Sequence, residues 1–199
     1  LYGPNANDKI RFLPVDIKGD KTRFDQGGNN ILNSIRRLCT TYNCKALIFD
    51  TPAGNQLTAA WALRASKDIV TTMRITHQFT TGTIDYLKLR DVETTGKRYI
   101  IVPNAIPQEP ILIDGLPYSL ENVRLGIINR IKEEIKTSNN QFDLTMLEKD
   151  ENGIYGIPEV KRFKIRESLL YKIPAEVRTT DESLALKQYH KLVKVICGN

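Results

Sequence analysis

The sequence has no long hydrophobic run and no leader pattern at its start. Apolar stretches such as 46–49 and 99–102 are far shorter than the roughly 20 residues that a membrane-spanning helix needs. The residues after Leu1 also lack the basic, apolar and small-residue pattern of a secretory signal. We therefore expect a soluble protein of the cytoplasm that carries no membrane anchor.

Cysteine and histidine are scarce. The three cysteines, Cys39, Cys44 and Cys197, are an odd number without CxxC spacing, which predicts reduced thiols rather than a disulfide framework or an iron–sulfur cluster. The only histidines are His77 and His190, and no G-x-S-x-G motif is present. Hydrolysis by a nucleophilic serine or cysteine with a histidine base therefore has no support.

What is present is the composition of an ordinary globular protein. The 199 residues are 41% hydrophobic and 26% charged, and we expect them to form a single domain over residues 1–199. The formal net charge is +6 and the isoelectric point is near 9.2. This charge favours a polyanionic partner, which a basic protein binds through phosphate contacts.

Extended and helical patterns alternate along the chain, which predicts an α/β fold with a mostly parallel β-sheet flanked by helices. Ser119 is expected to cap one helix, and Thr179 with Glu182 to form a capping box at the start of the last. A proline-rich loop is expected over 103–117 and a turn over 150–153. The expected helices cover residues 29–42, 57–65, 80–92, 120–136 and 179–198, and the expected strands cover 10–15, 45–49, 68–73, 98–102 and 142–147.

The apolar run at 46–49 leads directly into Asp50, Thr51, Pro52 and Gly54. A carboxylate at the end of a buried parallel strand is suited to hold a water on Mg²⁺, because that ion prefers oxygen ligands. Pro52 favours an extended Thr51, and Gly54 allows the backbone to approach a terminal phosphate closely. The alternative interpretation is a simple turn at the end of a strand.

The order of segments resembles the ParA and MinD family of partition ATPases, the deviant Walker A class of P-loop proteins. The D-x-P-A-G loop of that family matches residues 50–54, and its strand ending in an asparagine matches Pro103-Asn104. Its late I-P-x-x-x-R segment looks like residues 157–163, and its C-terminal helix is similar to the segment that carries Ala185, Tyr189, Leu192 and Val193. The resemblance runs from about residue 10 to the end of the chain.

The resemblance implies a P-loop NTPase fold of the SIMIBI type that binds ATP and Mg²⁺ and dimerises across the nucleotide. It implies an ATP-dependent switch that acts in plasmid or chromosome partitioning, with non-specific DNA and a ParB-like protein as partners. In this scheme Asp50 supports Mg²⁺ and catalysis. The residues implied in nucleotide binding are Asp50, Thr51, Pro52 and Gly54 on the phosphate side, and Asn104, Pro158 and Glu159 around the adenine.

The chain departs from the family in lacking the K-G-G-x-G-K-[ST] loop that holds phosphates. Gly27-Gly28 is followed by two asparagines, and Gly96-Lys97 lacks the preceding glycines and the hydroxyl residue. The family order places the loop before Leu1. We therefore expect the chain to be the C-terminal two-thirds of a ParA/MinD-like domain, with ATPase activity dependent on the missing segment.

The basic stretch after residue 160 has three interpretations. Lys161, Arg162, Lys164 and Arg166 would contact DNA phosphates, lie at a dimer edge, or form a solvated strand face. DNA is favoured over a membrane because the last helix is followed by almost nothing. A non-catalytic interaction module of the same fold remains an alternative function, as does an ATPase component of a ligase or reductase.

Overall fold

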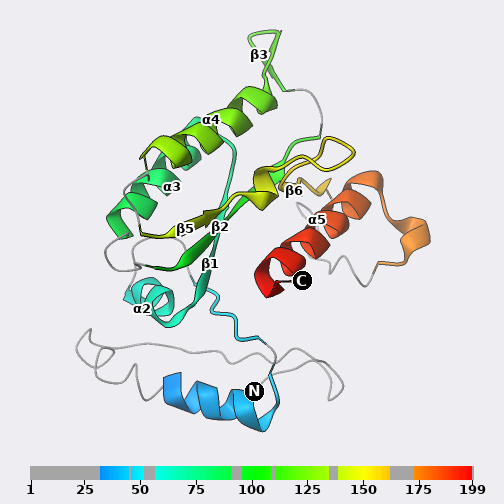
Figure 1. Cartoon of the computed structure of the whole chain (residues 1–199). Coiled ribbons are helices and arrows are strands. Elements are labelled where there is room, and N and C mark those ends of the chain that lie inside the picture. Colours follow the sequence, from blue (N-terminus) through cyan, green and yellow to red (C-terminus); the bar gives the residue numbers. More distant parts are fainter. Residues whose placement is uncertain are drawn as a thin grey trace. The chain divides into compact units, whose positions relative to one another are not determined.

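The computed structural model describes residues 32–44, 46–51, 57–90, 96–108, 111–134, 139–161 and 173–198. The internal contacts of the chain divide it into two compact units, Leu1–Ser66 and Lys67–Asn199. The described part of the first unit contains a helix over residues 32–41 and helix α2, Leu57–Ala65. Both helices lie where the sequence predicts them. The second unit contains the sheet (Figure 1).

The predicted strand at 45–49 is not formed. Residues 46–51 belong to no strand, Ile48 is 85% exposed and Leu47 is 43% exposed. A single extended segment has no ladder hydrogen bonds of its own, and no strand among the described residues pairs with it. The interpretation of this run as a buried parallel strand is therefore wrong in this structure, and Asp50 lies exposed rather than at the end of a strand.

The second unit is built on a four-stranded parallel sheet, which confirms the α/β class. Its strands are β1 (Asp68–Met73), β2 (Arg98–Ile106), β5 (Gln141–Asp143) and β6 (Ile157–Pro158). β2 is central: β1 pairs with residues 98–103 of β2, while β5 and β6 pair with its beginning and its end. The expected strands at 68–73 and 98–102 are confirmed, and the second is longer than expected because it continues to Ile106.

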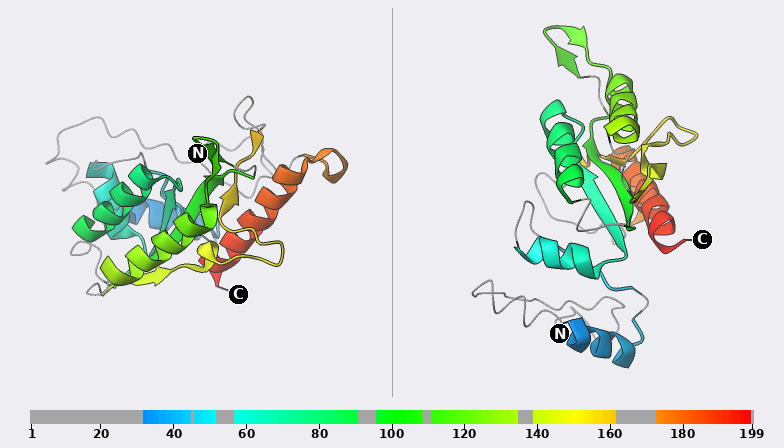
Figure 2. Two further views of the ribbon diagram at one scale, coloured as in Figure 1. Left: turned by 90° about the horizontal axis from the view of Figure 1, so that it is seen from above. Right: turned by 60° about the vertical axis from the view of Figure 1, so that its left-hand side comes forward.

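Helices cover both faces of this sheet (Figures 1 and 2). α3 (His77–Arg90) connects β1 to β2, and α4 (Leu120–Glu134) lies between β2 and β5. Because both connections proceed in the same direction along the sheet and such crossovers are right-handed, α3 and α4 lie on one side. The last helix, α5 (Thr180–Cys197), covers the other side. None of the described helices is long and apolar enough to cross a lipid bilayer.

The core is centred on β2. Ile100 and Val102 contact Met146, Ile157 and the apolar side of α5, whereas Tyr99 and Ile101 alternate with them and point to the other face. All four β2 side chains are at most 1% exposed. A strand that is buried on both faces has a continuous apolar sequence instead of an alternating one, as these residues do.

Caps and turns bound the elements as the sequence predicts. Ser119 Oγ accepts a hydrogen bond from Asn122 N at the start of α4, at 3.2 Å. Thr179 and Glu182 form a complete capping box at the start of α5, and Gly198 follows its end. In the turn at 150–153, Asp150 Oδ1 accepts hydrogen bonds from the amides of Asn152 and Ile154, both at 2.9 Å.

Two segments differ from the expectation. The loop at 103–117 contains a hairpin of β3 (Leu112–Ile113) and β4 (Leu116–Pro117), whose turn residues have the positive φ angles of 52° and 78° that a two-residue hairpin turn requires. The expected strand at 142–147 ends at Asp143, because Asp143 Oδ1 accepts a hydrogen bond from Thr145 N at 3.0 Å. A 3₁₀ turn, Thr145–Leu147, then buries its last two side chains.

Candidate functional site

The carboxyl ends of β1, β2 and β6 meet at one edge of the sheet. Met73 at the end of β1 pairs with Pro103, and Asn104 pairs with Ile157 on the other side. The bridge between Ile106 and Pro158 continues this contact. Ligands of open α/β sheets bind at this kind of edge, because the loops that follow the strands converge there.

A β-bulge shapes the end of β2. The register shifts between Asn104 and Ile106, and the intervening Ala105 has a φ of 54°. Asn104 Oδ1 accepts a hydrogen bond from Ala105 N at 2.8 Å, which holds this bend. A positive φ at a non-glycine residue costs about 1–2 kcal/mol, so the surrounding contacts maintain a strained backbone at the edge.

Gly156 allows the segment before β6 to approach β2. Its φ is 57°, and a Cβ atom built on it would lie 2.5 Å from the Pro103 oxygen and 2.7 Å from Ile106 Cδ1. The Gly156 amide donates to Met146 O at 2.7 Å, and the Glu159 amide donates to Ile106 O at 2.8 Å. These bonds fix residues 156–159 directly against the bulge.

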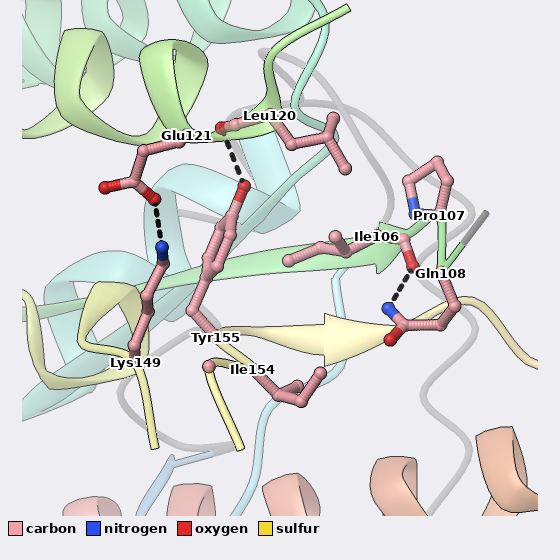
Figure 3. Close-up of a pocket in the computed structure, with 9 residues that line it drawn as sticks. Ile106, Pro107, Gln108, Leu120, Glu121, Lys149, Ile154 and Tyr155 are labelled. Atoms are coloured by element: carbon pink, nitrogen blue, oxygen red, sulfur yellow. Dashed lines mark hydrogen bonds and ion pairs between the residues drawn. The ribbon is translucent and has the colours of Figure 1, made fainter. Parts of the chain in front are cut away.

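A pocket of about 200 Å³ opens beside this edge, just beyond the bulge (Figure 3). It lies between the end of β2, the first turn of α4 and the turn that precedes β6. The Tyr155 hydroxyl donates a hydrogen bond to Leu120 O at 3.1 Å, and Gln108 Nε2 donates to Ile106 O at 3.0 Å. Its lining is Ile106, Pro107, Gln108, Leu120, Glu121, Lys149, Gly153, Ile154 and Tyr155.

One wall of the pocket is charged. Glu121 accepts two hydrogen bonds from Arg124, at 2.6 and 3.1 Å, and pairs with Lys149 at 2.6 Å. Hydrogen bonds to these two cations, of which the bonds to Arg124 have the larger effect, lower the pKa of Glu121 to about 2. Arg124 also donates to Leu147 O at 2.9 Å and lies 5.8 Å from the centre of the Tyr155 ring. Burial raises the pKa of Tyr155 to about 12, so this phenol remains a neutral donor at physiological pH.

The structure brings together only part of the predicted site. Asn104 is exposed at the edge, and Pro158 and Glu159 lie directly beside the end of its strand. Asp50 and Thr51 are exposed in the first unit, whereas Pro52 and Gly54 lie outside the described residues. The described structure therefore places Asn104 beside Pro158 and Glu159, and the roles of these residues and of the expected phosphate-side residues in nucleotide binding stay predictions.

The basic stretch is described only at its first member. Lys161 is exposed, and its amide donates to Asp181 Oδ2 in the first turn of α5 at 3.1 Å. Arg162, Lys164 and Arg166 lie outside the described residues. Among the described residues, no group of three or more His, Cys, Asp or Glu side chains is placed to hold a metal ion.

The pocket itself was not anticipated from the sequence. Glu121 comes from α4, whereas Lys149 and Tyr155 flank the turn at 150–153, and only the tertiary fold brings these two segments together. A partial signal existed in the expected turn at 150–153 and in the two glycines, Gly153 and Gly156, that flank Tyr155. Comparison of the chain with known protein families, curated proteins and solved structures finds no match.

Proposed function

We propose that the edge formed by β2 and β6 binds the base of an adenine nucleotide, and that the chain acts as part of a ParA/MinD-like ATPase. The observation that carries this proposal is the pairing of Asn104 with Ile157 and of Ile106 with Pro158. Two segments about fifty residues apart in the sequence, which the family resemblance assigns to the same base, are neighbours at the carboxyl end of a parallel sheet.

The pocket beside this edge has the size and chemistry of a base site. Its volume of about 200 Å³ is below the roughly 300–1,000 Å³ of sites for whole drug-sized ligands. Ile106, Pro107 and Ile154 supply apolar surface for a flat ring, and Tyr155 adds an aromatic wall. The side-chain amide of Gln108 in the pocket, and that of Asn104 two residues before the lining begins, are of the type that reads the donor and acceptor pattern of a purine edge.

The phosphate side of the proposal rests on the resemblance. Asp50 would hold Mg²⁺ through water, and Thr51, Pro52 and Gly54 would follow the terminal phosphate. Mg²⁺ characteristically takes one or two carboxylates together with substrate phosphates and waters, so a single carboxylate is compatible with this role. In the same scheme the chain is a homodimer of SIMIBI type that partitions plasmid or chromosomal DNA with a ParB-like protein, and Lys161 with its basic neighbours contacts DNA phosphates.

The base site is tested by titrating the ¹⁵N-labelled chain with adenosine and ADP and following the amide resonances. We expect shifts concentrated at residues 104–108 and 153–159, larger with adenosine than with guanosine, and a several-fold weaker affinity in Asn104→Ala. Asn129→Ala, an exposed asparagine on α4, is the matched control and should bind as the parent does. Shifts spread evenly over the chain, or absent at millimolar adenosine, would overturn the proposal.

The catalytic role is tested separately. In protein that carries the phosphate loop expected before Leu1, Asp50→Ala should abolish phosphate release from ATP while the circular dichroism spectrum is unchanged. Turnover at the normal rate would remove Asp50 from the mechanism without affecting the base site.

A second function, a non-catalytic interaction module, is favoured by a different observation. Ile48 and Leu47 in the first unit, and Leu112 and Leu116 on the β3–β4 hairpin, are apolar side chains that are 43–85% exposed. Isolated exposed apolar residues are ordinary, but grouped ones indicate contact surfaces. If adenosine fails to bind while Leu112→Ser or Ile48→Ser alters self-association in sedimentation measurements, this second function is the better account.

A further inference from the structure

The first unit places two thiols against each other at the end of a helix. The helix over residues 32–41 is followed by a turn in which Asn43 has a left-handed φ of 49°. Cys44 N donates to Cys39 O at 2.8 Å, and Asn43 N donates to Thr40 O at 3.2 Å. These two bonds, six-to-one and five-to-two, define a Schellman motif.

In a Schellman motif the side chains at the third residue from the helix end and at the second residue after the cap contact each other. Here those positions are occupied by Cys39 and Cys44. Burial, followed by interaction with the Cys44 side chain, raises the pKa of the Cys39 thiol. Both are free thiols; Cys44 is exposed and Cys39 is partly covered.

The geometry points to a redox-sensitive dithiol, in which Cys39 and Cys44 form a disulfide across the helix end when a low-molecular-weight disulfide such as oxidised glutathione is present. The backbone hydrogen bond between the two residues holds their Cα atoms close, as a disulfide requires. This inference does not depend on nucleotide binding.

The reaction balances in two exchange steps. The exposed Cys44 thiol loses its proton, and its thiolate attacks one sulfur of oxidised glutathione, which releases one glutathione thiolate and leaves a mixed disulfide. Cys39 then loses its proton and attacks Cys44 Sγ, which releases the second glutathione thiolate. Two protein thiols are oxidised by two electrons, one disulfide is reduced to two thiols, and the two protons pass to the glutathione thiolates.

The consequence lies in the chain that follows. Cys44 is two residues before the segment 46–51, which belongs to no helix or strand and is exposed at every residue except Phe49. A disulfide would fix the left-handed cap at Asn43 and therefore the direction in which this segment leaves the helix. In the reduced form the same cap is held by non-covalent contacts, among them the two backbone hydrogen bonds.

The experiment equilibrates the chain in glutathione buffers of graded ratio, blocks remaining thiols with N-ethylmaleimide, and measures intact and tryptic masses. Cleavage after Arg37 and Lys45 yields one peptide that contains both cysteines. We expect this peptide to lose two hydrogens and carry no label, while Cys197 is labelled. A peptide in which both cysteines are labelled under oxidising buffer, or in which Cys44 retains glutathione, would overturn the inference.

Three variants separate the motif from general thiol reactivity. Asn43→Val puts a β-branched residue at a positive φ and should lower the equilibrium constant for disulfide formation about tenfold, whereas Asn43→Gly should preserve it. Cys197→Ser should leave the oxidised peptide unchanged. Equal disulfide formation in the valine and glycine variants would show that the helix end does not position the thiols.

Discussion

Two apolar runs of the same length differ in this protein: one is a buried strand, and the other is largely exposed and forms no strand. Residues 99–102 lie in the centre of β2 and are at most 1% exposed. Residues 46–49 belong to no strand, and Ile48 is 85% exposed. β2 has a hydrogen-bonded neighbour on each edge and helices on both faces, whereas no described strand pairs with the other run. Hydrophobicity alone therefore does not make a strand, because the backbone groups need partners as well.

The largest expected effect separates the two runs directly. Ile100→Ala removes a fully buried side chain between β2 and α5 and should reduce the free energy of unfolding by about 2–5 kcal/mol. Ile48→Ala removes an exposed one and should change it by no more than about 0.5 kcal/mol. Urea unfolding of both variants measures the difference. Similar losses in the two variants would show that residues 46–49 are buried in solution.

The next effect tests the contact that holds β6 against β2. Gly156→Ala combines a positive φ with a Cβ only 2.5 Å from the Pro103 oxygen, so we expect a loss of about 2–4 kcal/mol. Gly153→Ala is the matched control: its φ is 74° but nothing lies within 4 Å, so only the backbone term of about 1 kcal/mol remains. Thermal unfolding should show the larger loss of stability in Gly156→Ala. Equal losses in the two variants would mean that Gly156 does not lie so close to the Pro103 oxygen in solution.

A smaller effect concerns a feature that depends on local sequence and not on neighbours. Thr179→Ala removes the side-chain half of the α5 capping box and should destabilise the protein by about 1 kcal/mol. Thr180→Ala, at the exposed first residue of the helix, should change stability by less than about 0.5 kcal/mol. If chemical denaturation gives the same free energy of unfolding for both variants, the cap does not contribute to stability.

The smallest effect is a pH dependence at the wall of the pocket. The pKa of Glu121 is lowered from 4.5 to about 2, so its ion pairs stabilise the fold above pH 4.5 and lose that contribution as the pH falls toward 2. The side chain is 38% exposed, so solvent screening limits the contribution to about 0.2–1 kcal/mol.

This dependence is measured as the difference in unfolding free energy between the parent and Glu121→Gln across pH 5 to 2. The difference should shrink as the pH falls. A difference that is constant over this range would show that the carboxylate keeps an ordinary pKa in solution.

Several helix caps and turns of the second unit could be predicted from the sequence, because they depend on side chains within a few residues. The capping box at Thr179 and Glu182, the cap at Ser119 and the turn at Asp150 lie where their side chains predict them. The hairpin turn at Asp114 and Gly115 was readable in principle, since Asp-Gly between apolar residues favours that turn. The four prolines around it favoured a loop instead.

The candidate site was predictable only in part. Asn104 and Pro158 were assigned to one place by family resemblance, and the register of β2 and β6 brings them together. Glu121 and Arg124 form an i,i+3 pair on α4, which is a local signal, but Lys149 joins them only after α4 packs beside the turn that precedes β6. The bulge at Ala105 was also invisible, since alanine carries no preference for a positive φ.

The sequence by itself determined the α/β class, the positions of the helices and the ends that side chains cap, because these depend on periodicity and on hydrogen bonds within a few residues. Only the tertiary structure decided which apolar run became a strand, where β2 bends and which side chains line the pocket. These features depend on partners from distant parts of the chain. A strand forms where its backbone groups and both of its faces find such partners, and residues 46–49, as apolar as those of β2, show the result when no described strand supplies them.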